Sequence, residues 1–565
     1  MRALLAALLL CAVSAYAASP VVSCTPSRTS GVAPLFVLLD CTATTDADLP
    51  DTGNNTNRAF RELEYRHNFG DPNAGLWGYG ANTTLSKNQA TGAITGHVFE
   101  TTGAYTITTT VSDGTSTRRV TNVITVNDPE VIFTGAATVC IANVTATAGS
   151  GGCPSGATTP TGTVDLPATI SANCNAATKR CLLKRGDSFT ATSAVTISSA
   201  GAITLGAYGT GAKPIITASA NINAILLNNA AINDLRLMDL DVRTQSTGLG
   251  VSVSVSATMT RVTMLRVTLG PNAQGSIVVG GTVTMTESVV QDSILGPNQD
   301  TGPGGVTLFG RFVSSAILGN SIGPSEGQHV IRFVKFQKSV FANNTAGDAP
   351  LNETVLTIRA VEHVTADDDS YYFIVSDNDL FTGDRTNALL AVEPVNATAN
   401  DWFYDYIIER NWLRFGAFNR PPWKSGFTTT RFSSQMSGLA PHEACGCILP
   451  RRIPMSPIIY AGLMWQQVLR HVSWIKGSTP QRTPIRLIFN PQEPTRSSMA
   501  RRPHRLGFVS EPGVTMRPAE PQGFRTAIRT FSDVMTRQQT SGWGLSFPGL
   551  VLGVGDIWPL VEHTR

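Results

Sequence analysis

Between Val21 and Asn127, apolar and polar positions alternate in short runs. Glycine, proline and asparagine separate these runs, and the stretch from Gly103 to Val111 shows the alternation clearly. An alternation with a period of two is the pattern of a half-buried strand, and frequent turn residues favour short antiparallel strands. We therefore predict an antiparallel β-sandwich over residues 18–128.

A different pattern repeats along the middle of the chain. Its unit is six residues long: the first and last residues are apolar, and the fourth is a position that we call the marker. The marker residues are Leu240, Val267, Asp292, Asn320, Asn344, Asn378 and Asn411. The markers are 24 to 34 residues apart. Helical repeats are disfavoured because the apolar spacing in each unit is two and Thr, Val, Ser and Gly, poor helix formers, are abundant. The pattern predicts a parallel β-solenoid over residues 165–418, each coil of which buries its apolar face only when the next coil stacks on it.

The asparagines at the marker suggest how the coils are held in register. In a solenoid, the same inward position recurs above itself in every coil. A buried amide needs hydrogen-bond partners, and a stack of identical amides supplies them. We predict an asparagine ladder at a bend, formed by Asn320, Asn344, Asn378 and Asn411. Earlier coils carry other residues at the marker, so the ladder should be absent or weaker there.

Two phrases in the first region resemble a known domain family. The segments Tyr65–Asp71 and His97–Asp113 resemble the motifs of the polycystic-kidney-disease (PKD) domain, an immunoglobulin-like β-sandwich. The chain departs from the family pattern, which has tryptophan, aspartate and glycine there, at His67, Asn68 and Pro72. We interpret Phe69 and Tyr105 as core aromatics. The resemblance implies a spacer, or a contact with polysaccharide or protein, rather than a catalytic domain.

The repeat region also resembles a known family. The segments Lys184–Phe189 and Gly201–Ile216 resemble the opening of right-handed parallel β-helix proteins of the pectin-lyase-like type, found in secreted bacterial proteins. The resemblance covers residues 165–418. Together, these observations imply an all-β fold: an immunoglobulin-like PKD sandwich, a linker at residues 129–164, a right-handed parallel β-helix and an irregular C-terminal tail.

The composition changes after about Phe418. Half of the 32 prolines lie beyond residue 420, where Asn490 is the only asparagine. Prolines cannot donate to sheet ladders, so the coil period cannot continue through them. We interpret residues 419–565 as an atypical tail that arises from a reading-frame shift or is disordered. A helical subdomain around Ile458–Ile475 is the alternative, since its apolar spacing is helical.

The N-terminus indicates export. Residues 1–17 contain one arginine, an apolar run and Ala15-Tyr16-Ala17, which is the pattern of a cleaved signal peptide. We expect a secreted, extracellular, monomeric protein without a membrane span, because the apolar run is shorter than the about 20 residues that a span needs. A net charge of +3 and 15% charged residues give no basic footprint for nucleic acid.

Six of the nine cysteines lie between residue 18 and the middle of the chain, and they fit an oxidising compartment. They are Cys24, Cys41, Cys140, Cys153, Cys174 and Cys181. An even number in a secreted protein suggests disulfides, and pairing of nearest neighbours is the simplest of the 15 connectivities that six cysteines allow.

Charged residues are predicted to share one outward face of the solenoid. Alternation directs Ile331 and Phe333 inward and Arg332 outward. Corresponding positions in the next two coils are Arg359 and Glu393. Because neighbouring strands lie about 4.8 Å apart, we predict one column of Arg332, Arg359 and Glu393. Near this column we expect His329, Lys335, Glu362 and His363.

The resemblance to β-helix polysaccharide lyases implies a chemistry for this column. Such enzymes neutralise a uronate carboxylate with a cation and remove the C5 proton with Lys, Arg or His, whereas β-helix glycoside hydrolases use clustered carboxylates. Arginine binds carboxylates in bidentate fashion, so Arg332 and Arg359 are candidates for gripping a uronate or sulfate. His329 or Lys335 is the candidate base. The alternative interpretation is an ordinary solvated face on which Glu393 pairs with Arg359.

Four carboxylates in a long coil suggest a calcium site. They are Asp367, Asp369, Asp377 and Asp379. Calcium takes six to eight oxygen ligands, and these side chains supply oxygens close together in sequence. A solvated acidic loop is the alternative. Calcium is the only cofactor that we expect.

The expected function follows mainly from the resemblance. We expect a secreted carbohydrate-active protein, a polysaccharide lyase or glycoside hydrolase acting on an acidic polysaccharide, with the PKD module as spacer or binding aid. The alternative is a non-catalytic extracellular protein that binds glycan or protein along the same face.

Overall fold

The structure is a computed structural model of the chain. It describes residues 18–51, 56–219, 221–244, 250–272, 274–299, 305–350, 353–360, 369–382, 388–394, 403–415, 426–428 and 432–436. The predicted signal peptide, the segment Ile458–Ile475 and all but two short strands of the predicted tail lie outside the described residues. The sandwich and the coils belong to one compact unit, Met1–Leu487.

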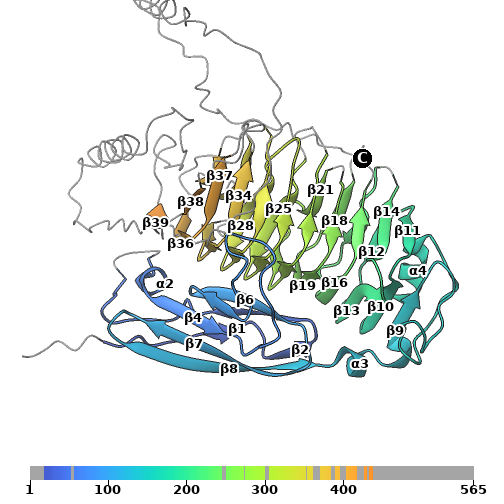
Figure 1. The fold of residues 1–565 in the computed structure, drawn as a ribbon, viewed down its shortest axis with the longest axis horizontal. Helices are drawn as coiled ribbons and strands as arrows, with labels where there is room; N and C mark the ends of the chain where they lie inside the picture. The colour runs from blue at the N-terminus through green and yellow to red at the C-terminus, as the bar shows by residue number, and fades with distance from the viewer. Residues whose placement is uncertain are drawn as a thin grey trace, which may run out of the picture. The chain divides into compact units, whose positions relative to one another are not determined.

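The N-terminal region is a two-sheet β-sandwich, as predicted (Figure 1). One sheet is antiparallel and comprises β1 (Thr25–Pro26), β3 (Leu35–Asp40) and β6 (Ile94–Phe99). The other comprises, in spatial order, β2 (Ser30–Val32), β8 (Thr117–Asn127), β7 (Gly103–Ser112), β4 (Glu64–Asn68) and β5 (Gln89–Thr91). The helix α2 (Arg58–Glu62) is capped by Asn57, whose side chain accepts from the amide of Phe60 at 2.8 Å.

The sandwich core follows from the alternation in sequence. Along β7, the inward residues Tyr105, Ile107, Thr109 and Val111 are buried, while the residues that alternate with them are more exposed. Phe69 is also buried, which confirms it and Tyr105 as core aromatics. The disulfide Cys24–Cys41 links the residue before β1 to the residue after β3. These inward side chains bury the apolar area that holds the two sheets together.

A short connecting region closes one end of the coils. It contains α3 (Pro129–Ile132), the 3₁₀ turn η1 (Gly135–Ala137), β9 (Thr138–Ile141) and α4 (Leu166–Asn173). Strand β9 pairs in parallel with the first coil strand, so parallel pairing begins within residues 129–164, the predicted linker. Leu166 and Ile170 of α4 are buried in the core of the coils. The disulfides Cys140–Cys153 and Cys174–Cys181 lie here, so all three predicted pairings are confirmed.

Three stacks of parallel strands form the β-helix (Figure 1). The first stack continues from β9 through β10 (Lys179–Lys184), β13 (Ile203–Tyr208), β16 (Asn233–Met238), β19 (Met259–Leu265), β23 (Val289–Gln291), β26 (Ala316–Leu318), β29 (Val340–Ala342), β33 (Ile374–Ser376) and β36 (Phe403–Glu409). The second comprises β12 (Val195–Ile197), β15 (Ile225–Leu227), β18 (Val251–Val255), β21 (Gly275–Val279), β25 (Leu308–Val313), β28 (Ile331–Gln337), β31 (Thr354–Ala360) and β35 (Ala388–Pro394).

The third stack runs along the remaining side. It comprises β11 (Ser188–Ala191), β14 (Ile215–Ala218), β17 (Asp241–Arg243), β20 (Thr268–Leu269), β24 (Ile294–Leu295), β27 (Ser321–Ile322), β30 (Thr345–Gly347), β34 (Asp379–Thr382) and β37 (Trp412–Phe415). Two short strands, β22 (Met285–Thr286) and β32 (Ser370–Tyr371), lie where the first and second stacks meet.

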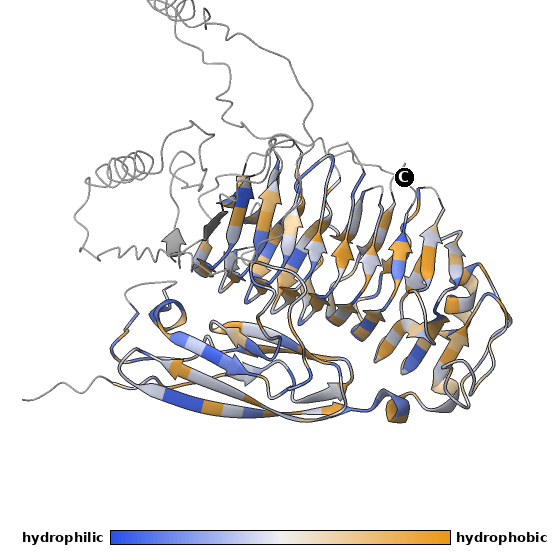
Figure 2. Cartoon of the chain, viewed as in Figure 1, coloured by the Kyte–Doolittle hydropathy of each residue, from blue (hydrophilic) through white to orange (hydrophobic). Residues whose placement is uncertain are grey.

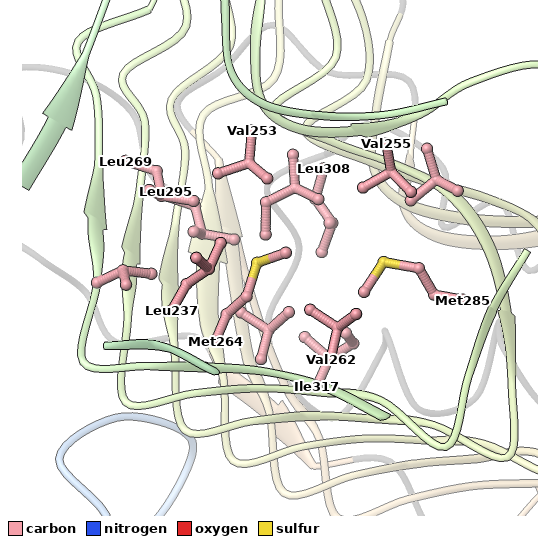
Figure 3. Packing of buried hydrophobic residues seen from close by; sticks show 14 of the residues in the cluster. Leu237, Val253, Val255, Val262, Met264, Leu269, Met285, Leu295, Leu308 and Ile317 are labelled. Atoms are coloured by element: carbon pink, nitrogen blue, oxygen red, sulfur yellow. The ribbon is translucent and has the colours of Figure 1, made fainter. Parts of the chain in front are cut away.

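The core of the coils is apolar and continuous. Figure 3 shows residues from all three stacks pointing at one another, among them Met264, Val253 and Leu295. Figure 2 shows the same alternation as bands of apolar and polar colour along the strands. Each coil therefore supplies only part of a shared core, as the repeat predicted.

The sandwich packs on the outward face of the first stack. One apolar cluster joins Phe36 and Trp77 of the sandwich to Leu265, Ala316 and Ile374 of the coils. Buried Arg236 donates from Nε to the carbonyl of Pro34 at 3.0 Å and from Nη2 to that of Val32 at 2.8 Å. These contacts place the sandwich against the coils, and its predicted role as a spacer or binding aid stays a prediction.

The far end of the coils has antiparallel strands. The short strand β38 (Gly426–Thr428) pairs antiparallel with β37, and β39 (Phe432–Met436) pairs antiparallel with β36. The parallel winding therefore ends near residue 415, close to the predicted boundary at 418. Among the described residues, no helix is long and apolar enough to cross a membrane.

Candidate functional site

The predicted asparagine ladder is present and fully buried. The backbone N–H and Nδ2 of Asn320 both donate to Oδ1 of Asn344, each at 2.9 Å. Asn344 donates in the same way to Asn378 at 2.9 and 3.1 Å, and Asn378 donates to Asn411 at 3.0 and 2.8 Å. Each asparagine side chain thus fixes the register of the next coil. Residues at the same position of successive coils therefore lie side by side on the outer surface of the β-helix.

The ladder extends one coil further than predicted, through a serine. The amide of Ser293 donates to Oδ1 of Asn320 at 2.9 Å, and Oγ of Ser293 accepts from the amide of Val267 at 3.1 Å. Placing Asp292 at the marker was wrong by one residue. Asp292 occupies the preceding bend, where its φ is 51°. The bend residue differs from coil to coil, so spacing alone did not distinguish it from the ladder position.

The predicted charged column holds for two of its three members. Arg359 of β31 pairs with Glu393 of β35, as expected. Arg332 of β28 pairs with Thr357, so its predicted place in line with Arg359 was wrong by two residues. A displacement of two positions keeps a side chain on the same face of a sheet, so both arginines still point outward.

Arg359 lies at the centre of a small polar cluster. Its Nη2 is 3.1 Å from Oε1 of Glu393 and 3.1 Å from Nε2 of His329. Its Nε donates to Oγ1 of Thr357 at 3.4 Å, and that hydroxyl donates to Glu393 at 3.3 Å. On the other side of the imidazole, Nδ1 of His329 is 3.0 Å from Oε2 of Glu353. We call these five residues, with Arg332 and Gln328, the arginine cluster.

Arg332 is the poorly compensated cation of this cluster. Its Nη2 donates to the amide oxygen of Gln328 at 2.7 Å. Its Nε is buried and has no acceptor among the described residues. Burial lowers the pKa of Arg332 to about 10, the charge of Arg359 lowers it too, and Glu353 and Glu393 oppose the fall. A guanidinium in this state gains from any added carboxylate.

His329 is held neutral at neutral pH. Burial lowers its pKa, the hydrogen bond to Glu353 opposes that fall, and the charge of Arg332 adds to it. A neutral imidazole has one donor and one acceptor nitrogen. The backbone amide of Thr354 donates to Nδ1 at 2.8 Å, and Oε2 of Glu353 lies 3.0 Å from the same nitrogen. Nη2 of Arg359 lies 3.1 Å from Nε2, so a donor faces each ring nitrogen and His329 lies directly against Arg359.

The remaining predicted residues are less closely tied to the cluster. Lys335 lies on β28 beyond a bulge and pairs with Arg311 of the preceding coil. Its role as a base stays a prediction. Glu362 and His363 lie outside the described residues.

The four aspartates proposed for calcium are not all described. Asp367 lies outside the described residues. Arg410 binds both carboxylate oxygens of Asp377 at 2.8 Å, and Arg414 binds both of Asp379 at 2.5 Å. A calcium ion at these two carboxylates would have to displace both arginines. The described residues contain no group of three His, Cys, Asp or Glu placed to hold a metal ion, and the calcium site stays a prediction.

Sequence reasoning missed several members of the cluster. Glu353 and Gln328 lie in the segments before their strands, where no periodicity marks them. The sequence around Thr357 gave no sign of a polar role, because its neighbours on both sides are apolar. In the structure, Thr357 is fully buried and hydrogen-bonds to Arg359 and Glu393. Only the pairing register could have revealed it, because Thr357 is the true partner of Arg332.

Comparison with known proteins gives little that bears on this site. No family model matches the chain, and no curated protein matches it. Among solved structures, the crystal structure of the tailspike protein gp49 from Pseudomonas phage LKA1 is similar, with 8% sequence identity and a TM-score of 0.21. The match covers 71% of this chain and 64% of that chain, which is less than two thirds of the tailspike's length.

Proposed function

We propose that the protein is a secreted carbohydrate-active protein whose β28–β31–β35 face binds an acidic polysaccharide. The observation that supports this most is the state of Arg332: a largely buried guanidinium whose hydrogen-bond acceptor is a neutral amide. A buried cation without a full set of acceptors is costly, and a ligand carboxylate would remove that cost. Neutral sugars would not.

Arg359 offers a second cation for the same ligand, held in a fixed position. Glu393 and His329 hold one edge of its guanidinium, so its position is fixed before any ligand arrives. Preorganised groups lose less entropy on binding. The repulsion between Arg359 and Arg332, which lowers the pKa of Arg332, falls when an anion binds beside both. A uronate carboxylate or a sulfate group is an anion that could bind beside both arginines.

The test is the affinity for polygalacturonate, measured by calorimetry. Arg332→Ala should weaken binding roughly tenfold to a hundredfold, since a charge-assisted hydrogen bond contributes about 1.5–3 kcal/mol. Arg243→Ala is the matched control: Arg243 is a partly exposed arginine of β17 in the third stack, where it pairs with Asp241 at 2.7 Å. Equal affinities for all three proteins would refute the proposal, as would equally strong binding of neutral dextran by the unaltered protein.

Cleavage by β-elimination is the second candidate function. It is favoured by the lowered pKa of His329, which keeps an imidazole neutral beside two arginines. In this reaction a base takes the C5 proton of the uronate, a C4–C5 double bond forms, and the C4–O bond breaks as the leaving sugar takes up a proton. Nε2 would serve as the base only in the tautomer that carries its hydrogen on Nδ1, and only when Arg359 turns from His329 to the substrate carboxylate.

An absorbance assay separates cleavage from binding alone. Unsaturated uronates absorb in the ultraviolet, so a lyase acting on alginate, pectate or chondroitin raises the absorbance with time. A hydrolase releases reducing ends without that rise. If both assays stay flat while polygalacturonate binds, the non-catalytic binding protein is the correct alternative.

We further propose that the sandwich is a PKD domain and that the chain is exported. The motif residues Phe69, Asp71 and Tyr105 support the first, and three disulfides support the second, because disulfides persist in oxidising compartments. The contacts of the sandwich with the coils favour a fixed wall beside the β-helix over a flexible spacer. Expression with the leader intact and recovery of disulfide-bonded protein outside the cell would test export.

A further inference from the structure

A line of outward side chains leads away from the arginine cluster along the second stack. From Arg332 toward the preceding coils, the strand pairings continue through Phe309 of β25, Val278 of β21, Ser254 of β18 and Leu226 of β15. The residues before and after each of these four are buried, so alternation directs the four side chains outward. We call these four residues the outer column. Figure 1 shows the strands β28, β25, β21 and β18 in this order along the β-helix.

The outer column is accessible and serves no core. All four residues are partly exposed. Phe309, Val278 and Leu226 are apolar, yet none of them belongs to the apolar clusters that the described residues form. Single exposed apolar residues are normal on a protein surface, whereas three in one line that ends at the cation Arg332 form a continuous feature. Ser254 adds a hydroxyl that can both donate and accept.

The column is accessible on only one side of Arg332. Toward the following coils, the strand pairings continue it through Thr357 and Ala391, and both of these residues are buried. A chain held at Arg332 therefore finds accessible residues of this column only in the direction of β25 and the strands before it.

The spacing of the strands suits a linear chain of sugar rings. Neighbouring strands lie about 4.8 Å apart, which is close to the advance of a sugar chain per pyranose ring. A chain laid along the axis of the β-helix thus meets a new strand with each ring. The C–H groups on one face of a pyranose ring pack on aromatic or aliphatic side chains, while its hydroxyls remain at the edge. Sites of this kind combine apolar surface with a few polar groups that fix the orientation.

We propose that the acidic polysaccharide runs from the arginine cluster along the outer column, parallel to the axis of the β-helix. The ring next to the bound uronate packs on Phe309, and further rings lie over Val278, Ser254 and Leu226. This inference rests on the proposed function, because the arginine cluster holds the anionic end. The ligand is then a linear chain of several rings, and a single uronate makes only part of the contacts.

The test is calorimetry on the full chain with oligogalacturonates of two and of five rings. The longer one should bind at least about tenfold more tightly, because more apolar surface is covered. Phe309→Ala should weaken binding of the five-ring chain about fivefold to tenfold, since the sugar loses the phenyl surface. Ser254→Glu places a negative charge three strands from Arg332. It should weaken binding of the five-ring chain about threefold to tenfold and leave the two-ring chain, which does not reach it, unchanged.

Matched controls lie on the third stack. Phe381→Ala removes a partly exposed phenylalanine of β34, and Thr217→Glu adds a charge at an exposed position of β14. Both should bind as the unaltered protein does. The inference is overturned, and the proposed function stands, if Arg332→Ala weakens binding while Phe309→Ala and Ser254→Glu match their controls or both chain lengths bind equally. If Arg332→Ala changes neither affinity, or neither chain binds, the proposed function fails and this inference fails with it.

Discussion

At the scale of single residues, His67 shows how burial sets a charge state. Its ring is buried, with Nδ1 3.0 Å from Oγ1 of Thr109 and Nε2 2.8 Å from the carbonyl oxygen of Gly92. The carbonyl only accepts, so Nε2 carries the hydrogen and Nδ1 accepts from the threonine. Burial lowers the pKa of His67 from 6.5 to about 4, and the bond to Gly92 opposes that fall. The neutral ring is therefore part of the folded sandwich.

This predicts a pH dependence with a definite sign. In the unfolded chain, His67 takes up a proton below about pH 6.5. In the folded chain it takes up a proton only below about pH 4. Stability from this residue is thus complete above pH 6.5 and falls by about 3 kcal/mol as the pH drops to 4. Urea unfolding at pH 7 and pH 5 should show a smaller loss for His67→Gln than for the unaltered protein. Equal losses would contradict the assignment.

Residue roles in the arginine cluster were only partly predictable. Alternation along β28 was enough to point Arg332 outward, because a period of two is a property of any strand. Its partner was not predictable, since the coil between Arg332 and Thr357 is shorter than the 27 residues that separate Arg332 from Arg359. Coil length is set by loops, which follow no period.

At the scale of elements, the ladder is the feature that sequence predicted best. An asparagine side chain can both donate and accept, so its recurrence at one buried marker position favours a stack of amides that bond to one another. Bends beside the ladder take residues as different as Asp292, Gly319 and Arg410, all with positive φ. A search for one residue type cannot find such positions, and for that reason Asp292 was misplaced.

Removing one rung should destabilise the coils measurably. Asn344→Ala leaves the buried amide and Nδ2 of Asn320 without an acceptor and removes the donor to the carbonyl of Ile317. We expect the free energy of unfolding to fall by about 2–3 kcal/mol. Asn344→Ser should lose less, because Ser293 shows that a serine can serve as a rung. Chemical denaturation measures both.

A surface asparagine provides the comparison for that experiment. Asn122→Ala removes one hydrogen bond from Nδ2 to the carbonyl of Cys24 at a partly exposed site. Its cost should stay within about 1 kcal/mol. A ladder variant no less stable than Asn122→Ala would mean that the stacked amides do not hold the coils together.

At the scale of the whole molecule, the sandwich closes one face of the β-helix and leaves the arginine cluster on another stack. The sequence predicted both parts but not their contact, because the joining surface consists of outward residues that look like ordinary strand positions. Gly319 shows how close the contact is: a Cβ added there would lie 2.4 Å from the ring of Trp77.

Gly319→Ala therefore tests the contact. Its φ of 62° is a left-handed conformation that costs an alanine about 1–2 kcal/mol, and the clash with Trp77 adds to that. Gly281→Ala is the control, since its φ is 56° and nothing lies within 4 Å of the added Cβ. Gly319→Ala should lower the midpoint of thermal unfolding further and speed amide exchange in β23 and β26. Matching behaviour of the two variants would show that the sandwich does not pack there.

The central claim is that an acidic polysaccharide binds across β28, β31 and β35. The most direct measurement is a crystal structure of the full chain with a galacturonate oligosaccharide. The account predicts a uronate carboxylate hydrogen-bonded to Arg332 and Arg359, with Glu393 still holding one edge of Arg359. An oligosaccharide bound elsewhere, with Gln328 as the unchanged partner of Arg332, would contradict it.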